Sequence, residues 1–253
     1  MISGVYQTIL EKAALDIGFD LPNGKVGEWL IFASSHVPLK IWIGAENENS
    51  FIVVFSDEKL IDSLKELGTL VDTDLPKDTA FALSVNDTKL LYPLLRRAFQ
   101  LSRALPNEPL REFKKETQNL PTTTEVERLV VQRVGQDIFR SCLMDYWDGK
   151  CAVTGLAIPE LLKASHIKPW RDCESDAERL DVFNGLLLSP NLDAAFDRGF
   201  ISFDDEGKIL FSPLLQSTSS QHLGLSPTLK IPKLEEQHKP YMQWHRERLF
   251  KKK

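Results

Sequence analysis

The 253-residue sequence has few cysteines and no long apolar run. Cys142, Cys151 and Cys173 form no Cys-x-x-Cys pair, so nothing indicates a disulfide framework or a zinc ribbon. No stretch approaches the roughly 18 apolar residues of a membrane span, and residues 1–10 lack the basic and apolar regions of a signal peptide. We therefore expect reduced thiols, no structural zinc, no membrane partner and a cytoplasmic location.

An excess of basic residues is also absent. The formal net charge is -5, from 31 Lys and Arg against 36 Asp and Glu, so the whole chain exerts no general attraction on nucleic acid. A local basic face could still bind DNA if the acidic side chains lie elsewhere on the surface. A hydrophobic fraction of 42% with 26% charged residues is typical of a globular protein.

Residues 1–105 are predicted to form a mixed α/β module. Short segments rich in β-branched and aromatic residues alternate with segments that have helical spacing of leucines. The predicted strands are residues 29–33, 39–43, 51–55 and 81–85. The predicted helices are residues 5–15, a segment capped by Ser56 and running to Leu67, and residues 87–105.

Residues 106–123 differ in composition from the module before them. They contain Pro106, Pro109 and Pro121 among Asn, Thr and paired charges, which indicates a linker without regular structure. Residues 124–253 are then the second predicted domain. This domain begins with a predicted helix that runs from the N-cap residue Thr124 to about Trp147. The apolar stripe of the helix, which includes Val130, indicates packing against the domain rather than contact with DNA bases.

The most informative part of the sequence lies between residues 164 and 199. His166 ends an apolar segment, predicted as a strand over residues 161–164, and Asn184 follows 18 positions later. Asp193 and Asp197 come 9 and 13 positions after Asn184. A histidine can act as a general base and carboxylates can bind a metal, which is the equipment needed to hydrolyse a phosphodiester.

Local signals place the two carboxylates on a helix. Residues 185–188 are predicted to form a strand, and Ser189 with Pro190 has the pattern of an N-cap followed by the first helical residue. Asp193 and Asp197 are then spaced i, i+4, so both carboxylates lie on one helix face and can converge on one cation. Oxygen ligands favour Mg²⁺ or Mn²⁺ over zinc.

Each of these residues also has an ordinary structural interpretation. His166 alone would more often be a structural histidine, and Asn184 before Gly185 could be only a turn residue. Asp193 could complement the helix dipole, and Asp197 could pair with Arg198. The four residues occurring together in this order favour a nuclease site.

Three separated blocks of this region resemble one family. They are ASHIKPW at 164–170, NGLLLSPNLDAAFDRG at 184–199 and ISFDD at 201–205. The segment from Cys151 to about Ser212 is similar to HNH endonucleases of the ββα-metal class. The resemblance implies an α+β protein, in which an N-terminal mixed α/β module precedes a C-terminal ββα-metal (HNH) nuclease domain with flanking helices.

The resemblance also implies residue roles. His166 matches the family's general base, and Asn184 matches the asparagine that braces the loop and aims the histidine. Asp193 and Asp197 match metal ligands. Many relatives carry Asp or His immediately before the base, where this chain has Ser165, which makes Ser165 the candidate third ligand. Relatives with two zinc-binding Cys-x-x-Cys pairs differ from this chain, which has only Cys151 nearby.

By the same resemblance, the reaction is hydrolysis of double-stranded DNA with one Mg²⁺ or Mn²⁺ per site, leaving 5′-phosphate and 3′-hydroxyl ends. Lys168, Arg171 and Arg198 lie near the motif and are the candidate phosphate contacts, with His245 and Arg246 as further candidates. One metal site per chain suggests either a homodimer or sequential nicking of the two strands.

The role of the N-terminal module is less determined by the sequence. We favour a module that recognises target DNA, including modified bases, in a restriction or phage-defence nuclease. An alternative is a module that binds a ligand or protein and gates a non-specific nuclease. A third interpretation is an HNH fold retained only for DNA binding. A basic concave surface on the module would favour recognition, and a closed apolar pocket would favour gating.

Overall fold

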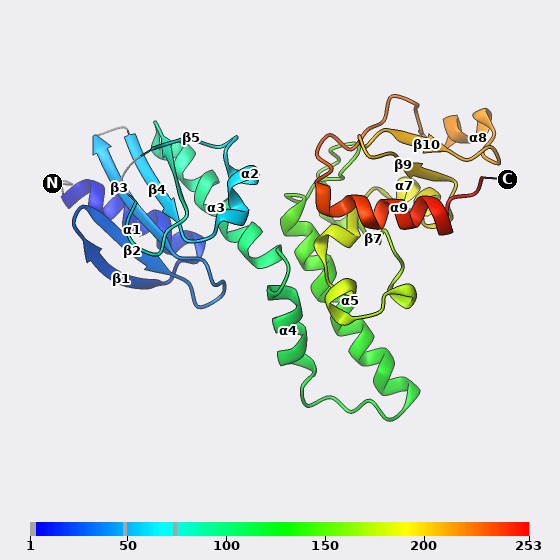
Figure 1. Ribbon diagram of the computed structural model, residues 1–253, viewed down its shortest axis with the longest axis horizontal. Helices are drawn as coiled ribbons and strands as arrows, with labels where there is room; N and C mark the ends of the chain where they lie inside the picture. The colour runs from blue at the N-terminus through cyan, green and yellow to red at the C-terminus, as the bar shows by residue number, and fades with distance from the viewer. Residues whose placement is uncertain (1–3, 48–49, 73–74, 253) are drawn as a thin grey trace. The chain divides into compact units, whose positions relative to one another are not determined.

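The computed structural model describes residues 4–47, 50–72 and 75–252. The chain divides into two compact units, residues 1–103 and 104–253 (Figure 1). Helices and mainly antiparallel strands occur in both units, so the fold class is α+β. Within the described ranges, no helix is long and apolar enough to cross a bilayer.

An antiparallel sheet forms the centre of the N-terminal unit. Its strand order is β1-β2-β3-β4-β6-β5. The strands are β1 (Leu21–Val26), β2 (Trp29–Ala33), β3 (Ile41–Asn47), β4 (Ser50–Phe55), β5 (Thr69–Leu70) and β6 (Phe81–Val85). Alternation along these strands sends one set of side chains to each face, so the sheet has two chemically distinct sides.

Helices α1 (Gly4–Ile17) and α3 (Thr88–Ala104) cover one face of this sheet (Figure 1). The ring of Tyr6 on α1 lies 6.5 Å from that of Phe51 on β4, and Phe99 on α3 meets Phe19 edge-on at 5.7 Å. Ile41 and Ile43 on β3 are fully buried on the same side. This face is therefore the hydrophobic core of the unit.

The predictions for this unit differ from the structure at the weaker elements. β1 and β5 are not predicted, because β1 contains Pro22 and Gly24 and β5 has only two residues. The strand predicted to begin at Leu39 begins at Ile41. Asp57 replaces Ser56 as the cap of a short 3₁₀ turn, and helix α2 extends only over Ile61–Leu64.

The C-terminal unit combines helices with two small hairpins. Its helices are α4 (Glu108–Thr117), α5 (Glu125–Tyr146), α6 (Asp176–Arg179), α7 (Pro190–Asp197), α8 (Ser217–His222) and α9 (Lys239–Arg248). Its strands are β7 (Lys163–His166) paired with β8 (Gly185–Leu188), and β9 (Ile201–Phe203) paired with β10 (Ile209–Phe211).

The segment 106–123 is not the irregular linker that the sequence predicts. It contains α4, with Pro109 in the first turn, where a missing backbone N–H costs no hydrogen bond. Phe113 on α4 is buried and lies against α5, at 3.2 Å from where a Cβ on Gly135 would be. Most of this segment is thus packed into the C-terminal unit.

Helix α5 supports the rest of that unit. Thr124 and Glu127 form a complete capping box, which confirms the predicted start of the helix. Phe139 and Leu143 are buried against β8, so close that a Cβ on Gly185 would lie 2.6 Å from the Phe139 ring. The packed stripe begins later than predicted, because Val130 is 47% exposed.

Candidate active site

The strands β7 and β8 and the helix α7 form a ββα unit. β7 runs antiparallel to β8 with His166 opposite Gly185, and α7 follows β8 directly after the N-cap residue Ser189. The first strand begins two residues later than predicted, since Pro159 starts a 3₁₀ turn that ends at Leu161. The hairpin nevertheless presents His166 at the end of its strand, as the sequence predicts.

The His166 ring is held by three contacts. Its Nε2 lies 2.9 Å from the carbonyl oxygen of Arg179, which can only accept, so Nε2 carries the proton. The ring stacks on Phe139 with centroids 3.7 Å apart and meets Trp170 edge-on at 5.7 Å. With its proton on Nε2, the neutral ring has its basic lone pair on Nδ1.

The surroundings of His166 keep the ring neutral. Burial lowers its pKa to about 4, and the hydrogen bond to the Arg179 carbonyl opposes this only in part. A neutral imidazole is the form that can accept a proton from water. His166 is thus oriented and unprotonated at neutral pH, as a general base must be.

Asn184 fixes the loop that carries the histidine. It is fully buried, its Oδ1 accepts from the backbone N–H of Lys168 at 2.8 Å, and its Nδ2 donates to the carbonyl oxygens of Lys168 and Glu178, each at 3.1 Å. These bonds join β7 to the segment that supplies the Arg179 carbonyl. Of its two interpretations, these contacts favour bracing of the loop over a simple turn.

The two aspartates on α7 interact with each other. Burial raises the pKa of Asp193, while Ser165 and Lys163 lower it. Burial also raises the pKa of Asp197, and the charge of Asp193 raises it further. Asp193 is half-buried and Asp197 is exposed, and two neighbouring carboxylates that repel each other are stabilised when a cation binds between them.

Ser165 adds an oxygen to this pair. The residue is 2% exposed, and its Oγ makes no hydrogen bond of regular geometry among the described residues, although it lies close enough to Asp193 to lower that pKa. A buried hydroxyl without a partner is uncommon. Asp193, Asp197 and Ser165 thus form a hard oxygen set that fits Mg²⁺ or Mn²⁺. Within the described ranges, no cluster of three or more His, Cys, Asp or Glu could hold a metal, so water or substrate would complete the coordination.

The predicted phosphate contacts have different environments. Arg171 and Arg198 are exposed, and both lower the pKa of Asp197, so their positive charges lie near the carboxylate pair. Lys168 differs from its prediction. It is 9% exposed and its Nζ forms a 2.7 Å ion pair with Glu178, so its charge is neutralised inside the loop rather than offered to a phosphate.

The two C-terminal candidates are also structural. His245 is fully buried, donates from Nε2 to the Phe196 carbonyl, and accepts at Nδ1 from Ser202. Arg246 binds the Phe203 carbonyl and the Asp205 carboxylate. Both residues attach α9 to α7 and to the β9–β10 hairpin. Their side chains are occupied by these internal contacts and are not available as the predicted phosphate contacts.

Three contributors to the site are missed by the sequence reasoning. Phe139 stacks on the histidine from α5, and the Arg179 carbonyl sets its tautomer. Lys163 lowers the pKa of Asp193 from the start of β7. Helical spacing identifies Phe139 only as a packed residue, and no sequence signal marks a backbone carbonyl as a ring partner.

Comparison with known proteins agrees with this geometry. Residues 151–204 match the family model described as HNH endonuclease, a range that contains β7, β8, α7 and all the residues of the site except Phe139. The curated proteins contain no match to the chain. Residues 151–204 of this chain are therefore similar to HNH endonucleases.

Proposed function

We propose that this protein is a divalent-metal-dependent DNA endonuclease. The observation that carries the proposal is the orientation of His166. The Arg179 carbonyl oxygen lies 2.9 Å from Nε2, which leaves Nδ1 as the basic nitrogen at the end of β7. Helix α7, which packs on β7, carries the interacting carboxylates of Asp193 and Asp197.

The chain's own residues have distinct tasks in this reaction. Nδ1 of His166 takes a proton from the water that attacks phosphorus, and Asn184 keeps the loop in place. Arg171 and Arg198 hold the flanking phosphates. Asp193, Asp197 and Ser165 hold Mg²⁺ or Mn²⁺, which when bound supplies positive charge that stabilises the growing charge on the phosphate.

The direct test is cleavage of plasmid DNA by wild type and His166→Ala, with Mg²⁺, with Mn²⁺ and with EDTA. We expect metal-dependent cutting that falls by about 10²–10⁴-fold in the variant, the range for loss of a general base. Arg133→Ala, an exposed change on α5, is the matched control and should cut normally. Equal cutting by His166→Ala would refute the assigned base.

We further propose that the N-terminal unit directs the nuclease, in a restriction or phage-defence role. Its 14 acidic and 10 basic residues within 1–103 argue against recognition through phosphates alone. Plasmids carrying cytosine, 5-methylcytosine or 5-hydroxymethylcytosine, used in the same assay, separate the alternatives. Recognition of modification predicts a rate that depends on the base, and gating predicts equal rates that change only with an activator.

Cutting both strands also requires either two chains or two successive nicks. Exposed Val126, Leu129 and Val130 form an apolar patch on α5 that supports a homodimer as the proposed assembly. Sedimentation of the full chain at micromolar concentration tests this. A single monomeric species that also produces nicked circles before linear DNA would favour sequential nicking instead.

A further inference from the structure

The second face of the N-terminal sheet is the least explained surface of that unit. Helices α1 and α3 pack on the opposite face (Figure 1). Trp42, Ile52, Val54 and Ala82 form a buried cluster on this second face, and Trp29, Ile31 and Val71 pack against it. An apolar sheet face built around two tryptophans and covered by a loop rather than a helix is a candidate for binding.

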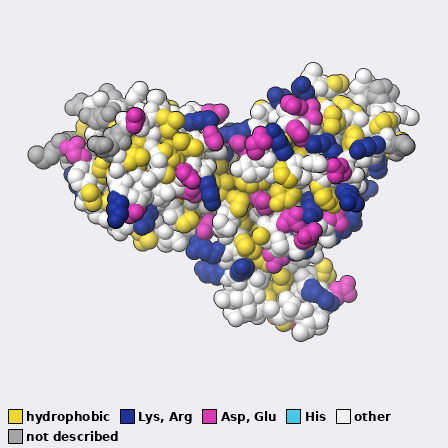
Figure 2. Space-filling view, viewed as in Figure 1, with side chains coloured by type: hydrophobic (Ala, Val, Ile, Leu, Met, Phe, Trp, Pro, Cys, Tyr) yellow, Lys and Arg dark blue, Asp and Glu magenta, His cyan; other side chains and the backbone are white. Residues whose placement is uncertain are grey.

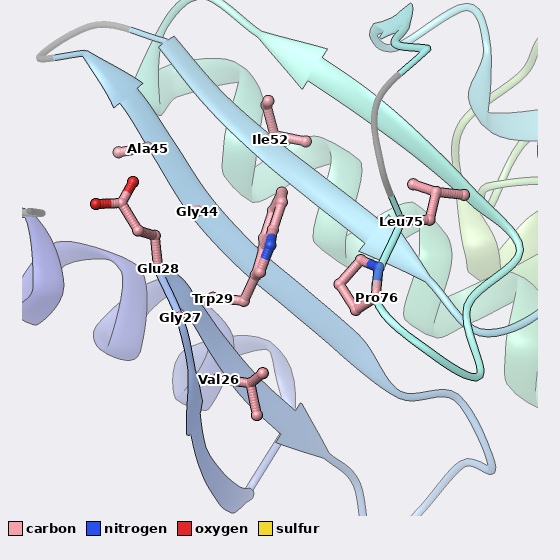
Figure 3. A pocket seen from close by; sticks show the side chains of 9 residues that line it. All are labelled: Val26, Gly27, Glu28, Trp29, Gly44, Ala45, Ile52, Leu75 and Pro76. Atoms are coloured by element: carbon pink, nitrogen blue, oxygen red, sulfur yellow. The ribbon is translucent and has the colours of Figure 1, made fainter.

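A pocket of about 500 Å³ opens at this face, within the usual range for small-ligand sites. Its walls come from three places in the chain. Glu28 and Trp29 lie at the β1–β2 turn, Gly44 and Ile52 lie on β3 and β4, and Leu75 and Pro76 belong to the loop before β6 (Figure 3). Figure 2 shows hydrophobic side chains reaching the surface over this unit.

Gly44 is what allows Trp29 to take its place in the pocket. A Cβ at position 44 would lie 3.0 Å from two atoms of the indole ring, closer than a relaxed contact. Because glycine has no side chain, the indole can lie directly against β3. Trp29 is only half-buried, so part of the ring remains available to the pocket. The sheet thus holds a large aromatic surface in a fixed orientation, which lowers the entropy cost of stacking.

The charge of the pocket restricts the ligand. None of its lining residues is Lys or Arg, and Glu28 is the one charged side chain among them. A phosphate or carboxylate inside the pocket would meet no Lys or Arg among the lining residues. Glu28 already has a partner, so its carboxylate does not define the ligand. A planar, uncharged ring fits better, because it can stack on Trp29 without an ionic partner.

We propose that this pocket binds a nucleobase, stacked on Trp29. The choice of a nucleobase over other heterocycles rests on the proposed nuclease function. Two sources offer the same chemistry: a base that has left its stack in a DNA strand, and the base of a free nucleoside. Lys77 is exposed and directly follows the lining residue Pro76, which makes it the candidate contact for a strand's phosphates.

Calorimetric titration of the full-length protein in EDTA tests the proposal without cleavage. The probes are the free nucleosides, including 5-methyldeoxycytidine, single-stranded 12-mers of each base, and an abasic 12-mer. We expect saturable binding of at least one base, and little binding of the abasic strand. Equal affinity for nucleoside and 12-mer identifies a gating ligand, whereas binding of the 12-mers alone identifies recognition of DNA.

Variants of the pocket give the decisive comparison. Trp29→Ala should weaken binding about tenfold or more, as loss of one stacking platform does. Gly44→Ala, which keeps the tryptophan but displaces its ring, should weaken binding in the same direction. Leu15→Ala, exposed elsewhere in the unit, is the control. Circular dichroism identifies any variant that fails to fold.

The outcomes separate this inference from the proposed nuclease activity. Absence of binding by every base, equal binding of the abasic strand, or binding unchanged in both Trp29→Ala and Gly44→Ala overturns the nucleobase pocket. Metal-dependent cutting by wild type would still stand in those cases. If wild type binds a base and Trp29→Ala does not, while wild type cuts DNA under no condition, the nucleobase pocket stands and the nuclease activity is rejected.

Discussion

At the scale of single residues, the candidate site depends on groups whose partners come from distant parts of the chain. His166 has its ring fixed by Phe139 from α5 and by a carbonyl 13 residues downstream. Asn184 completes the same loop from the turn immediately before β8. Changes at these residues therefore affect orientation as well as chemistry, and a useful test must separate stability from activity.

Ser165→Ala achieves that separation. The variant removes a buried hydroxyl that has no regular hydrogen bond, so unfolding in EDTA should cost the same free energy as in wild type or up to about 1 kcal/mol more. If Ser165 Oγ is a metal ligand, the rise in melting temperature caused by Mg²⁺ should become smaller, and cutting should need more metal. Calorimetry with and without Mg²⁺ measures both effects. An unchanged metal response would remove Ser165 from the ligand set.

At the scale of elements, the contact between α5 and β8 determines where the histidine is. A Cβ on Gly185 would lie 2.6 Å from the Phe139 ring and 2.8 Å from both Leu143 methyl carbons. β8 can therefore approach α5 only with glycine at this position. The close approach of α5 and β8 also places the Phe139 ring against the His166 ring. The packing of helix α5 therefore affects the orientation of the histidine.

Gly185→Ala should therefore destabilise the protein by about 1–3 kcal/mol, the usual cost of overpacking a core. Cutting should decrease as well, because displacement of Phe139 disturbs the ring stacked on it. Urea unfolding and the plasmid assay measure the two effects. Gly4→Ala, at a site with no atoms within 4 Å of the added Cβ, is the control and should be neutral. If Gly185→Ala has the same free energy of unfolding as wild type, α5 can move away from β8 without loss of stability.

At the scale of the whole molecule, buried neutral histidines connect stability to pH. Burial lowers the pKa of His238 to about 4 and that of His245 to about 4. The unfolded chain binds a proton at each ring near pH 6.5, whereas the folded chain does not until near pH 4. Their contribution is thus fully present above pH 6.5 and is lost as the pH falls toward 4.

We expect this loss to reach on the order of 1–2 kcal/mol per histidine at pH 5. Differential scanning calorimetry at pH 7.5 and pH 5 should show a lower melting temperature for the C-terminal unit at the lower pH. His245→Gln should respond less steeply to pH, because one of the three buried histidines that gain a proton on unfolding, of which His166 is the third, is missing. An equally steep response in this variant would assign the acid sensitivity to other groups.

The sequence is sufficient for the elements whose signals are local. The capping box at Thr124, the N-cap and proline that begin α7, and strands such as residues 51–55 depend on neighbouring residues alone, and the structure contains them. Local reasoning fails at 106–123, where prolines predict a linker but Phe113 finds a hydrophobic partner in α5. A helix stabilised by tertiary packing has no reliable local signal.

The same distinction applies to the site. The order and spacing of His166, Asn184, Asp193 and Asp197 are sufficient to indicate a resemblance to HNH endonucleases, and residues 151–204 match that family model. Only the tertiary structure decides that Lys168 is paired with Glu178, that His245 is buried, and that Phe139 and the Arg179 carbonyl orient the base. Spacing fixes which side chains share an element, whereas burial and charge depend on what the rest of the chain packs against them.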